Sequence, residues 1–311
     1  MPRLPAQFLR LWHVLSLDAP TVAALWCWAL ARAVHIHLPV AAPLMLALGT
    51  WLLYVADRLL DGLLAPHPSR LRERHLFHLR HRPAFVAASV CGVIALALLV
   101  VWCMPGFVLR AYIVLGICAL LYLLLVHIPR LRTPAGFIPF ARVIPKELAV
   151  GLIFAAATVI PTWERLRRTA PADAAPLLLL LPLFAALCTL NCIAIEIWEN
   201  AADPAAGGGG GERRGDLDAA GPASLHPITR VLGRHLTLTA LLLTAAAGIG
   251  AAFLRMRLRN GPAAAVALAL ALSALLFALL DRRPRILSPG ALRIAADAVL
   301  LTPLLLLPVL R

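Results

Sequence analysis

Two acidic pairs are the residues of this sequence best suited to chemistry. Asp57 and Asp61 lie four residues apart in "YVADRLLDG", and Glu199 and Asp203 repeat that spacing in "IEIWENAAD". Residues four apart share one face of a helix, with Cβ atoms about 5–6 Å from each other. Both pairs end long apolar runs, where a carboxylate is costly and is usually functional. We therefore expect two acid-bearing helices to share one cation site.

The ligand types indicate which cation this site would hold. All are hard carboxylate oxygens without Cys or His, which favours Mg²⁺ over zinc or copper. Mg²⁺ usually takes one or two carboxylates and completes its shell with water and phosphate oxygens. The alternative is that Asp57 ends its helix at the membrane interface, paired with a loop arginine. We expect Mg²⁺ as the cofactor, held by Asp57, Asp61, Glu196, Glu199 and Asp203.

Cationic and polar side chains near these acids predict a phosphate-bearing substrate. We expect Arg58, Arg142 and Lys146 to bind a diphosphate. Lys146 is the only lysine and follows Pro145 at an expected helix start, where the helix dipole favours anions. The alternative is an interface lysine that extends toward water.

Asn191 and Trp198 belong to the same apolar run as Glu199 and are candidates for contact with a second, acceptor substrate. The alternative for Asn191 is a hydrogen bond between helices, and for Trp198 it is core packing.

The elements that must position these residues are membrane-spanning helices. The chain is 61% hydrophobic with a mean hydropathy of +0.86. Nine apolar runs are each long enough to cross a bilayer, and lipid leaves the backbone no alternative to helices here. We expect an all-α bundle of nine transmembrane helices in a single domain, residues 1–311. The expected spans are 19–35, 39–60, 83–104, 106–128, 143–162, 174–198, 236–254, 261–281 and 287–310.

The distribution of arginine predicts the orientation. The longer connections, near 61–82, 129–142, 199–235 and 282–286, fall on the same side as the N-terminus. That side holds 18 of the 29 basic residues and the other side holds seven. The positive-inside rule places the N-terminus, these loops and the acidic site in the cytoplasm, at a bacterial inner membrane. The arginines in 165–168 and 255–259 run against this bias.

Histidines and cysteines offer rival chemistry. His75, His78 and His81 resemble one box of a membrane di-iron enzyme, but such enzymes need several boxes, so we expect a basic cytoplasmic helix here. The six cysteines lie in apolar runs without a CxxC pair, which favours packing over disulfides or metal binding. We expect lipids as partners and find no nucleic-acid motif and no removable signal peptide.

The acidic segments resemble the two aspartate-rich motifs of the UbiA superfamily of membrane prenyltransferases. "YVADRLLDG" is similar to the first motif through Asp57, Asp61 and Gly62, and "IEIWENAAD" to the second through Glu199 and Asp203. The segment "GPASLHPITRVLG" is also similar to one that follows in the family. The chain departs from the family pattern where Leu53 and Ile195 replace asparagines and Trp198 replaces an arginine.

The resemblance covers nearly the whole chain and implies a UbiA-like fold. It also implies Mg²⁺-dependent transfer of an isoprenyl group from a prenyl diphosphate to an aromatic or quinone-precursor acceptor. Two alternatives stay open. One is the same ionisation chemistry with a lipid acceptor or an intramolecular cyclisation. The other is a transporter or lipid-binding protein with the same fold, although a transporter would need polar residues along a whole pathway.

Overall fold

The computed structural model describes residues 3–64, 73–127, 145–201, 226–282 and 287–308, and all regular structure in these ranges is helical. The all-α prediction is thereby confirmed for the described chain. Eight of the nine expected spans correspond to one helix each. The helices are α1 (Arg3–Val14), α2 (Asp18–Ala33), α3 (Ala41–Leu64), α4 (Glu73–Arg80), α5 (Arg82–Cys103), α6 (Gly106–His127), α7 (Lys146–Thr169), α8 (Ala175–Ala201), α9 (Pro227–Arg234), α10 (Leu236–Met256), α11 (Gly261–Asp281) and α12 (Pro289–Val299), with 3-10 turns η3 (Pro171–Ala174) and η5 (Thr302–Leu306).

Six helical segments in the described ranges are long and apolar enough to cross a membrane, or seven if a bent pair counts as one span. The chain is therefore a membrane-type helical protein, but the count of nine spans is not confirmed. The six lie on α3, α5, α7, η3 with α8, α10 and α11.

The first and last expected spans differ most from the prediction. Segment 19–35 forms only the 16-residue α2, which meets α1 at a bend of 90°. Segment 287–310 forms α12, which ends at Val299 and continues as η5. Pro303 lies at the start of η5 and has no amide hydrogen to extend an α-helix. Neither element is long enough to span a bilayer alone.

The core of the bundle lies around α2 and α8. Trp26 of α2 is fully buried, stacks on Phe184 of α8 with ring centroids 4.8 Å apart, and donates a hydrogen bond to the Leu300 carbonyl. Half or more of the residues in the spanning windows of α7, α8 and α11 are buried, against 11% in α5. The apolar surface of α5 is therefore available to lipid.

Small residues bring α7 and α8 into close contact. A Cβ atom built on Gly151 of α7 would lie 2.7 Å from the backbone nitrogen of Thr189 on α8. Only glycine allows this approach, as is common between membrane helices. The contact fixes the two antiparallel helices in one register, which sets the start of α7 beside the end of α8.

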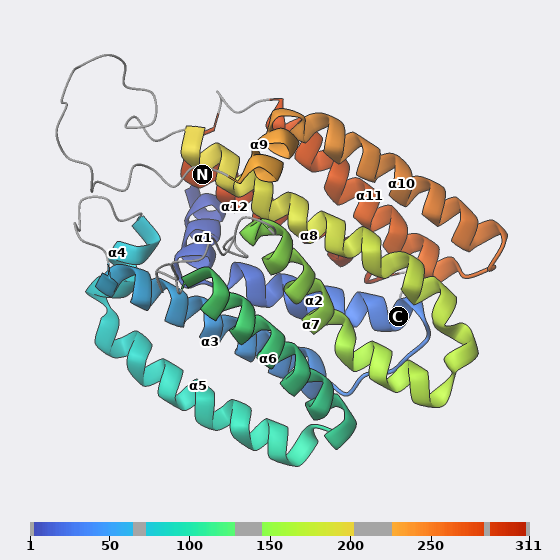
Figure 1. Ribbon diagram of the computed structural model, residues 1–311, viewed down its shortest axis with the longest axis horizontal. Helices are drawn as coiled ribbons and strands as arrows, with labels where there is room; N and C mark the ends of the chain where they lie inside the picture. The colour runs from blue at the N-terminus through green and yellow to red at the C-terminus, as the bar shows by residue number, and fades with distance from the viewer. Residues whose placement is uncertain (1–2, 65–72, 128–144, 202–225, 283–286, 309–311) are drawn as a thin grey trace, which may run out of the picture.

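Figure 1 shows that α3 and α8 run in the same direction, so that Asp57 and Glu199 lie toward the same end of the bundle. The short helices α1, α4 and α9 gather at this end, which we call the polar end. The expected loops 61–82 and 199–235 also depart from it. The sequence predicted that the two acid-bearing helices end on the same side of the bundle, and α3 and α8 do so.

The expected basic helix over the histidine cluster is α4, but two of its histidines are buried. His78 stacks on Phe85 of α5 with ring centroids 4.0 Å apart, and its Nε2 lies 3.3 Å from the Ser16 hydroxyl at the bend between α1 and α2. In the described ranges, these histidines belong to no group with metal-ligand spacing. Their role is to pack α4 against α1 and α5.

All six cysteines are free, and the packing role predicted for them fits the buried Cys27 and Cys188 but not the exposed Cys91, Cys103 and Cys118.

Candidate functional site

The acidic motif of α3 directs its charges to two different faces. Asp57 lies on the exposed face of the helix, whereas the next residue, Arg58, is only 2% exposed. The guanidinium of Arg58 lies 5.1 Å from the ring centroid of Tyr54, and its Nη1 donates a long 3.4 Å hydrogen bond to the Tyr54 carbonyl. Its Nε and Nη2 have no hydrogen-bond partner among the described residues. Asp61 lies on α3, but its side chain is outside the described residues.

The acids of α8 are each paired with a cation. Glu196 lies 3.0 Å from the Lys146 ammonium at the first residue of α7, and Glu199 accepts a 2.6 Å ion-paired hydrogen bond from Arg293 of α12. The predicted helix start at Lys146 is confirmed, with Pro145 as the N-cap residue. Arg293 was not singled out in the sequence. The structure thus brings Lys146 and Glu196 together as the sequence suggested, and adds Arg293.

Polar contacts between α8 and its neighbours hold these charges in place. Trp198 is buried and donates its indole N–H to Asp281 at the end of α11, and Thr237 of α10 donates to the same carboxylate. Glu147, next to Lys146, accepts a 2.8 Å hydrogen bond from Thr229 of α9. Trp198 is thus a packing residue that joins α8 to α11. Its predicted contact with an acceptor stays a prediction.

A second polar cluster lies deeper in the bundle. Asn191 of α8 donates to Asp297 of α12 at 3.4 Å, and Asp297 lies beside His13 of α1 and Asp18 of α2. All four lie where α1, α2, α8 and α12 meet. Of these four residues, only Asn191 was predicted from the sequence to be functional. The signal for Asp297 was an acid in an apolar run, four residues after Arg293, but nothing in the sequence indicated its partners.

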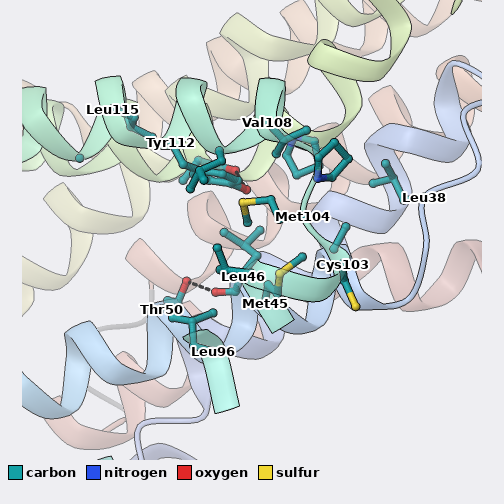
Figure 2. Close-up of a pocket in the computed structure, with 18 of the residues that line it drawn as sticks. Leu38, Met45, Leu46, Thr50, Leu96, Cys103, Met104, Val108, Tyr112 and Leu115 are labelled. Carbon is teal, nitrogen blue, oxygen red and sulfur yellow. Dashed lines mark hydrogen bonds between the residues drawn. The ribbon is translucent and has the colours of Figure 1, made fainter. Parts of the chain in front are cut away.

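An apolar cavity of about 480 Å³ lies between α3, α5, α6 and α7 (Figure 2). Its polar side chains are engaged with the backbone: the Thr50 hydroxyl donates to the Leu46 carbonyl, the Tyr112 hydroxyl to the Ala157 carbonyl and the Arg165 guanidinium to the His37 carbonyl. The remaining wall is almost entirely hydrocarbon. A cavity of this size and character is suited to an apolar chain.

The cavity wall leads along α3 to the first acidic residue. Gly49 and Leu53 line the cavity, and Asp57 follows at the next interval of four residues. Residues at this spacing form one stripe along a helix. Leu53 is 72% exposed, so this stripe faces away from the core. An apolar molecule in the cavity would therefore point one end toward Asp57.

The predicted ligands fit Mg²⁺ by type, but the three whose side chains are described, Asp57, Glu196 and Glu199, form no group with metal-ligand spacing. In the described part of the chain, the group of three possible metal ligands with atoms within 4.8 Å of one another is His13, Asp18 and Asp297. It includes none of the predicted Mg²⁺ ligands. Glu196 and Glu199 would have to leave Lys146 and Arg293 to bind a metal. An anionic diphosphate would favour this exchange, because it competes for both cations.

Two predicted residues lie outside the described chain. Arg142 precedes α7 and Asp203 follows α8, so their predicted roles in binding diphosphate and Mg²⁺ stay predictions.

No family model, no curated protein and no solved structure matches this chain.

Proposed function

We propose that the protein is a membrane prenyltransferase that transfers an isoprenyl group from its diphosphate, with Mg²⁺, to an aromatic or quinone-precursor acceptor. The observation that carries the proposal is the apolar cavity whose α3 wall ends at Leu53, one helical turn before Asp57. Such a cavity suits the hydrocarbon tail of the donor, and the charged end of the bundle suits its diphosphate. The motif resemblance to the UbiA superfamily supports the same substrate class.

The paired charges on α8 give the diphosphate a place to bind. Lys146 and Arg293 each hold a glutamate, and both can turn to phosphate oxygens when a diphosphate arrives. This releases Glu196 and Glu199, which together with Asp57 and the predicted Asp61 and Asp203 are the oxygen donors available to a divalent cation. When bound, Mg²⁺ neutralises charge on the departing diphosphate.

The reaction begins with cleavage of the bond between C1 of the prenyl group and the diphosphate oxygen. The electron pair stays on the oxygen, where Lys146 and Arg293 stabilise the charge. The acceptor then attacks the allylic cation and loses a proton. The apolar cavity excludes water, which would otherwise capture the cation.

One observation favours a non-enzymatic alternative, a lipid-binding membrane protein. Several cavity-lining residues, including Leu53 and Cys103, are exposed on the side of the bundle that faces lipid. An acyl chain could occupy such a cavity as well as a prenyl chain. A lipid acceptor or an internal double bond as acceptor would use the same cavity and charges.

The test is Mg²⁺-dependent release of pyrophosphate by the full-length protein from geranyl, farnesyl and geranylgeranyl diphosphates. We expect release from at least one donor, and its loss in Asp57→Ala. Asp173→Ala is the matched control, because Asp173 is an exposed acid in η3, at the other end of α8. Undiminished release in Asp57→Ala contradicts the role of Asp57, and no release from any donor favours the lipid-binding alternative.

A second variant tests the cavity. A Cβ atom on Gly116, which lines it, would meet no atom within 4 Å, so Gly116→Phe fills the cavity without a backbone clash. We expect it to abolish use of the longest accepted donor first. Gly248→Phe is the control, because Gly248 of α10 is equally open but outside the cavity.

A further inference from the structure

We propose that His13, Asp18 and Asp297 form a buried binding site for one divalent transition-metal ion, distinct from the predicted Mg²⁺ ligands. The three residues come from the last turn of α1, the first residue of α2 and the last turn of α12. Two of them lie about 280 residues from the third along the chain. Their meeting is a product of the tertiary fold.

The distances between the ligand atoms fit coordination to one ion. The Nδ1 atom of His13 lies 2.8 Å from Oδ2 of Asp18 and 4.0 Å from Oδ2 of Asp297, and the three ligand atoms are all within 4.8 Å of one another. Ligands about 2.1 Å from a metal lie about 3 Å apart when adjacent and about 4.2 Å apart when opposite. The group needs only small side-chain shifts to surround an ion.

The charge balance of the cluster calls for a cation. Asp18 and Asp297 are both buried, and a buried carboxylate is stable only when it is paired. Within the described residues, His13 is the only basic side chain within 4.0 Å of either carboxylate. Arg58 is a nearby positive charge, but no ion pair joins it to Asp18, and Arg293 is committed to Glu199. Asp18 and Asp297 share a side-chain hydrogen bond, which requires a proton between the two carboxylates, and a divalent ion would replace that proton.

The surroundings hold the two carboxylates in place. The remaining oxygen of Asp18 accepts a hydrogen bond from the Ala19 amide, and that of Asp297 accepts one from the Asn191 side chain. Such outer contacts orient ligands at metal sites. Within the described residues, the buried Oδ1 atom of Asn191 has no hydrogen-bond partner, so this amide keeps an unused acceptor beside Asp297.

The ligand types indicate the class of ion. One imidazole nitrogen with two carboxylates suits zinc, manganese or iron, whereas Mg²⁺ prefers oxygen ligands alone. The ion would join the bend between α1 and α2 to α12, at a point one helical turn from Arg293. It would thereby hold α12 in place, and α12 carries Arg293, the partner of Glu199.

The test uses the full-length protein in detergent, stripped with a chelator and titrated with Mn²⁺ alone. The background is Asp57→Asn/Glu196→Gln, which removes two predicted Mg²⁺ ligands and separates this site from the proposed active site. We expect one Mn²⁺ per chain, with ¹⁴N coupling from an imidazole in the electron spin echo spectrum, and displacement by Zn²⁺. Absence of binding, or bound Mn²⁺ without nitrogen coupling, would overturn the proposal.

Variants locate the ion. In the same background we expect Asp297→Asn to weaken Mn²⁺ binding at least tenfold and His13→Gln to remove the nitrogen coupling. Asp173→Asn should leave both unchanged. Unchanged affinity in Asp297→Asn contradicts the site. If Asp297→Asn does not fold, His13→Gln still decides, because loss of the nitrogen coupling in that variant assigns the ligand to His13 among the ten histidines of the chain.

Discussion

The acidic motifs of α3 and α8 have the same spacing and opposite environments. On α8, Glu196 and Glu199 are bound by Lys146 and Arg293. On α3, Asp57 is exposed on the stripe that continues the cavity wall, and the arginine next to it is buried. The spacing of acids therefore predicts which residues share a helix face, but the packing of neighbouring helices decides how far that face is buried.

We therefore propose different roles for the acidic motifs of α3 and α8. The α8 glutamates stand where two cations are already in place, which suits the diphosphate. Asp57 stands nearest to the apolar cavity, which suits the junction between diphosphate and prenyl chain. Four predictions test this difference, beginning with the largest effect.

Breaking the buried pair on α8 should destabilise the protein most. Arg293 and Glu199 are 16% and 11% exposed in their side chains, and Arg293→Met leaves a carboxylate without its cation. We expect a loss of about 3–5 kcal/mol in the free energy of unfolding, measured by denaturant titration in mixed micelles. Adding Glu199→Gln should restore much of it. By contrast, Asp57→Asn should change stability by less than about 0.5 kcal/mol. Equal losses in both variants would contradict the comparison.

Asp57→Asn should have a large effect on activity, in contrast to its small effect on stability. Asp57→Asn removes a charge near the reacting bond and little packing, so we expect pyrophosphate release to fall by about 10²-fold or more. The measurement is kcat with a saturating donor, together with a melting curve. A fall in melting temperature parallel to the fall in kcat would assign Asp57 a structural role.

The contact that sets α7 against α8 should show an intermediate effect. A Cβ atom at Gly151 would overlap Thr189, so Gly151→Ala should cost about 1–3 kcal/mol in stability and shift Lys146 relative to Glu196. Gly248→Ala, where no atom lies within 4 Å, is the matched control. Equal melting temperatures for the two variants would show that α7 and α8 tolerate a methyl group at position 151.

The exposed ion pair should contribute least to stability. The Lys146 side chain is 58% exposed and that of Glu196 is 24% exposed, so a double-mutant cycle with Lys146→Met and Glu196→Gln should give a coupling of about 0.2–1 kcal/mol. The coupling should decrease as salt is added. A coupling comparable to that of the Arg293–Glu199 pair would remove the distinction between exposed and buried pairs.

Several features of the fold and the site were predictable because they depend on nearby residues. Apolar runs gave the helices, and Pro145 gave the start of α7 at Lys146. The direction of α3 and α8 followed from counting spans. The break after Val299 was missed because leucines on both sides hide the effect of Pro303 on an otherwise apolar run.

The partners of the charges were not predictable, because they come from distant segments. Arg293 is 94 residues from Glu199, and Asp297 meets residues near the opposite end of the chain. The burial of the Arg58 side chain is another feature that was not predictable from the sequence. Nothing in "YVADRLLDG" distinguishes a buried arginine from one that lies beside Asp57, since the choice depends on which side of α3 the rest of the bundle covers.

The central claim is that Asp57 and Glu199 act on one diphosphate, and a double-mutant cycle on ligand binding tests it most directly. The probe is farnesyl thiodiphosphate, whose diphosphate leaves poorly, titrated with excess Mg²⁺ into the wild type, Asp57→Asn, Glu199→Gln and the double variant. The account predicts that each single variant weakens binding and that the double variant is little weaker than the weaker single variant. Wild-type affinity in either single variant, or fully additive losses, would contradict it.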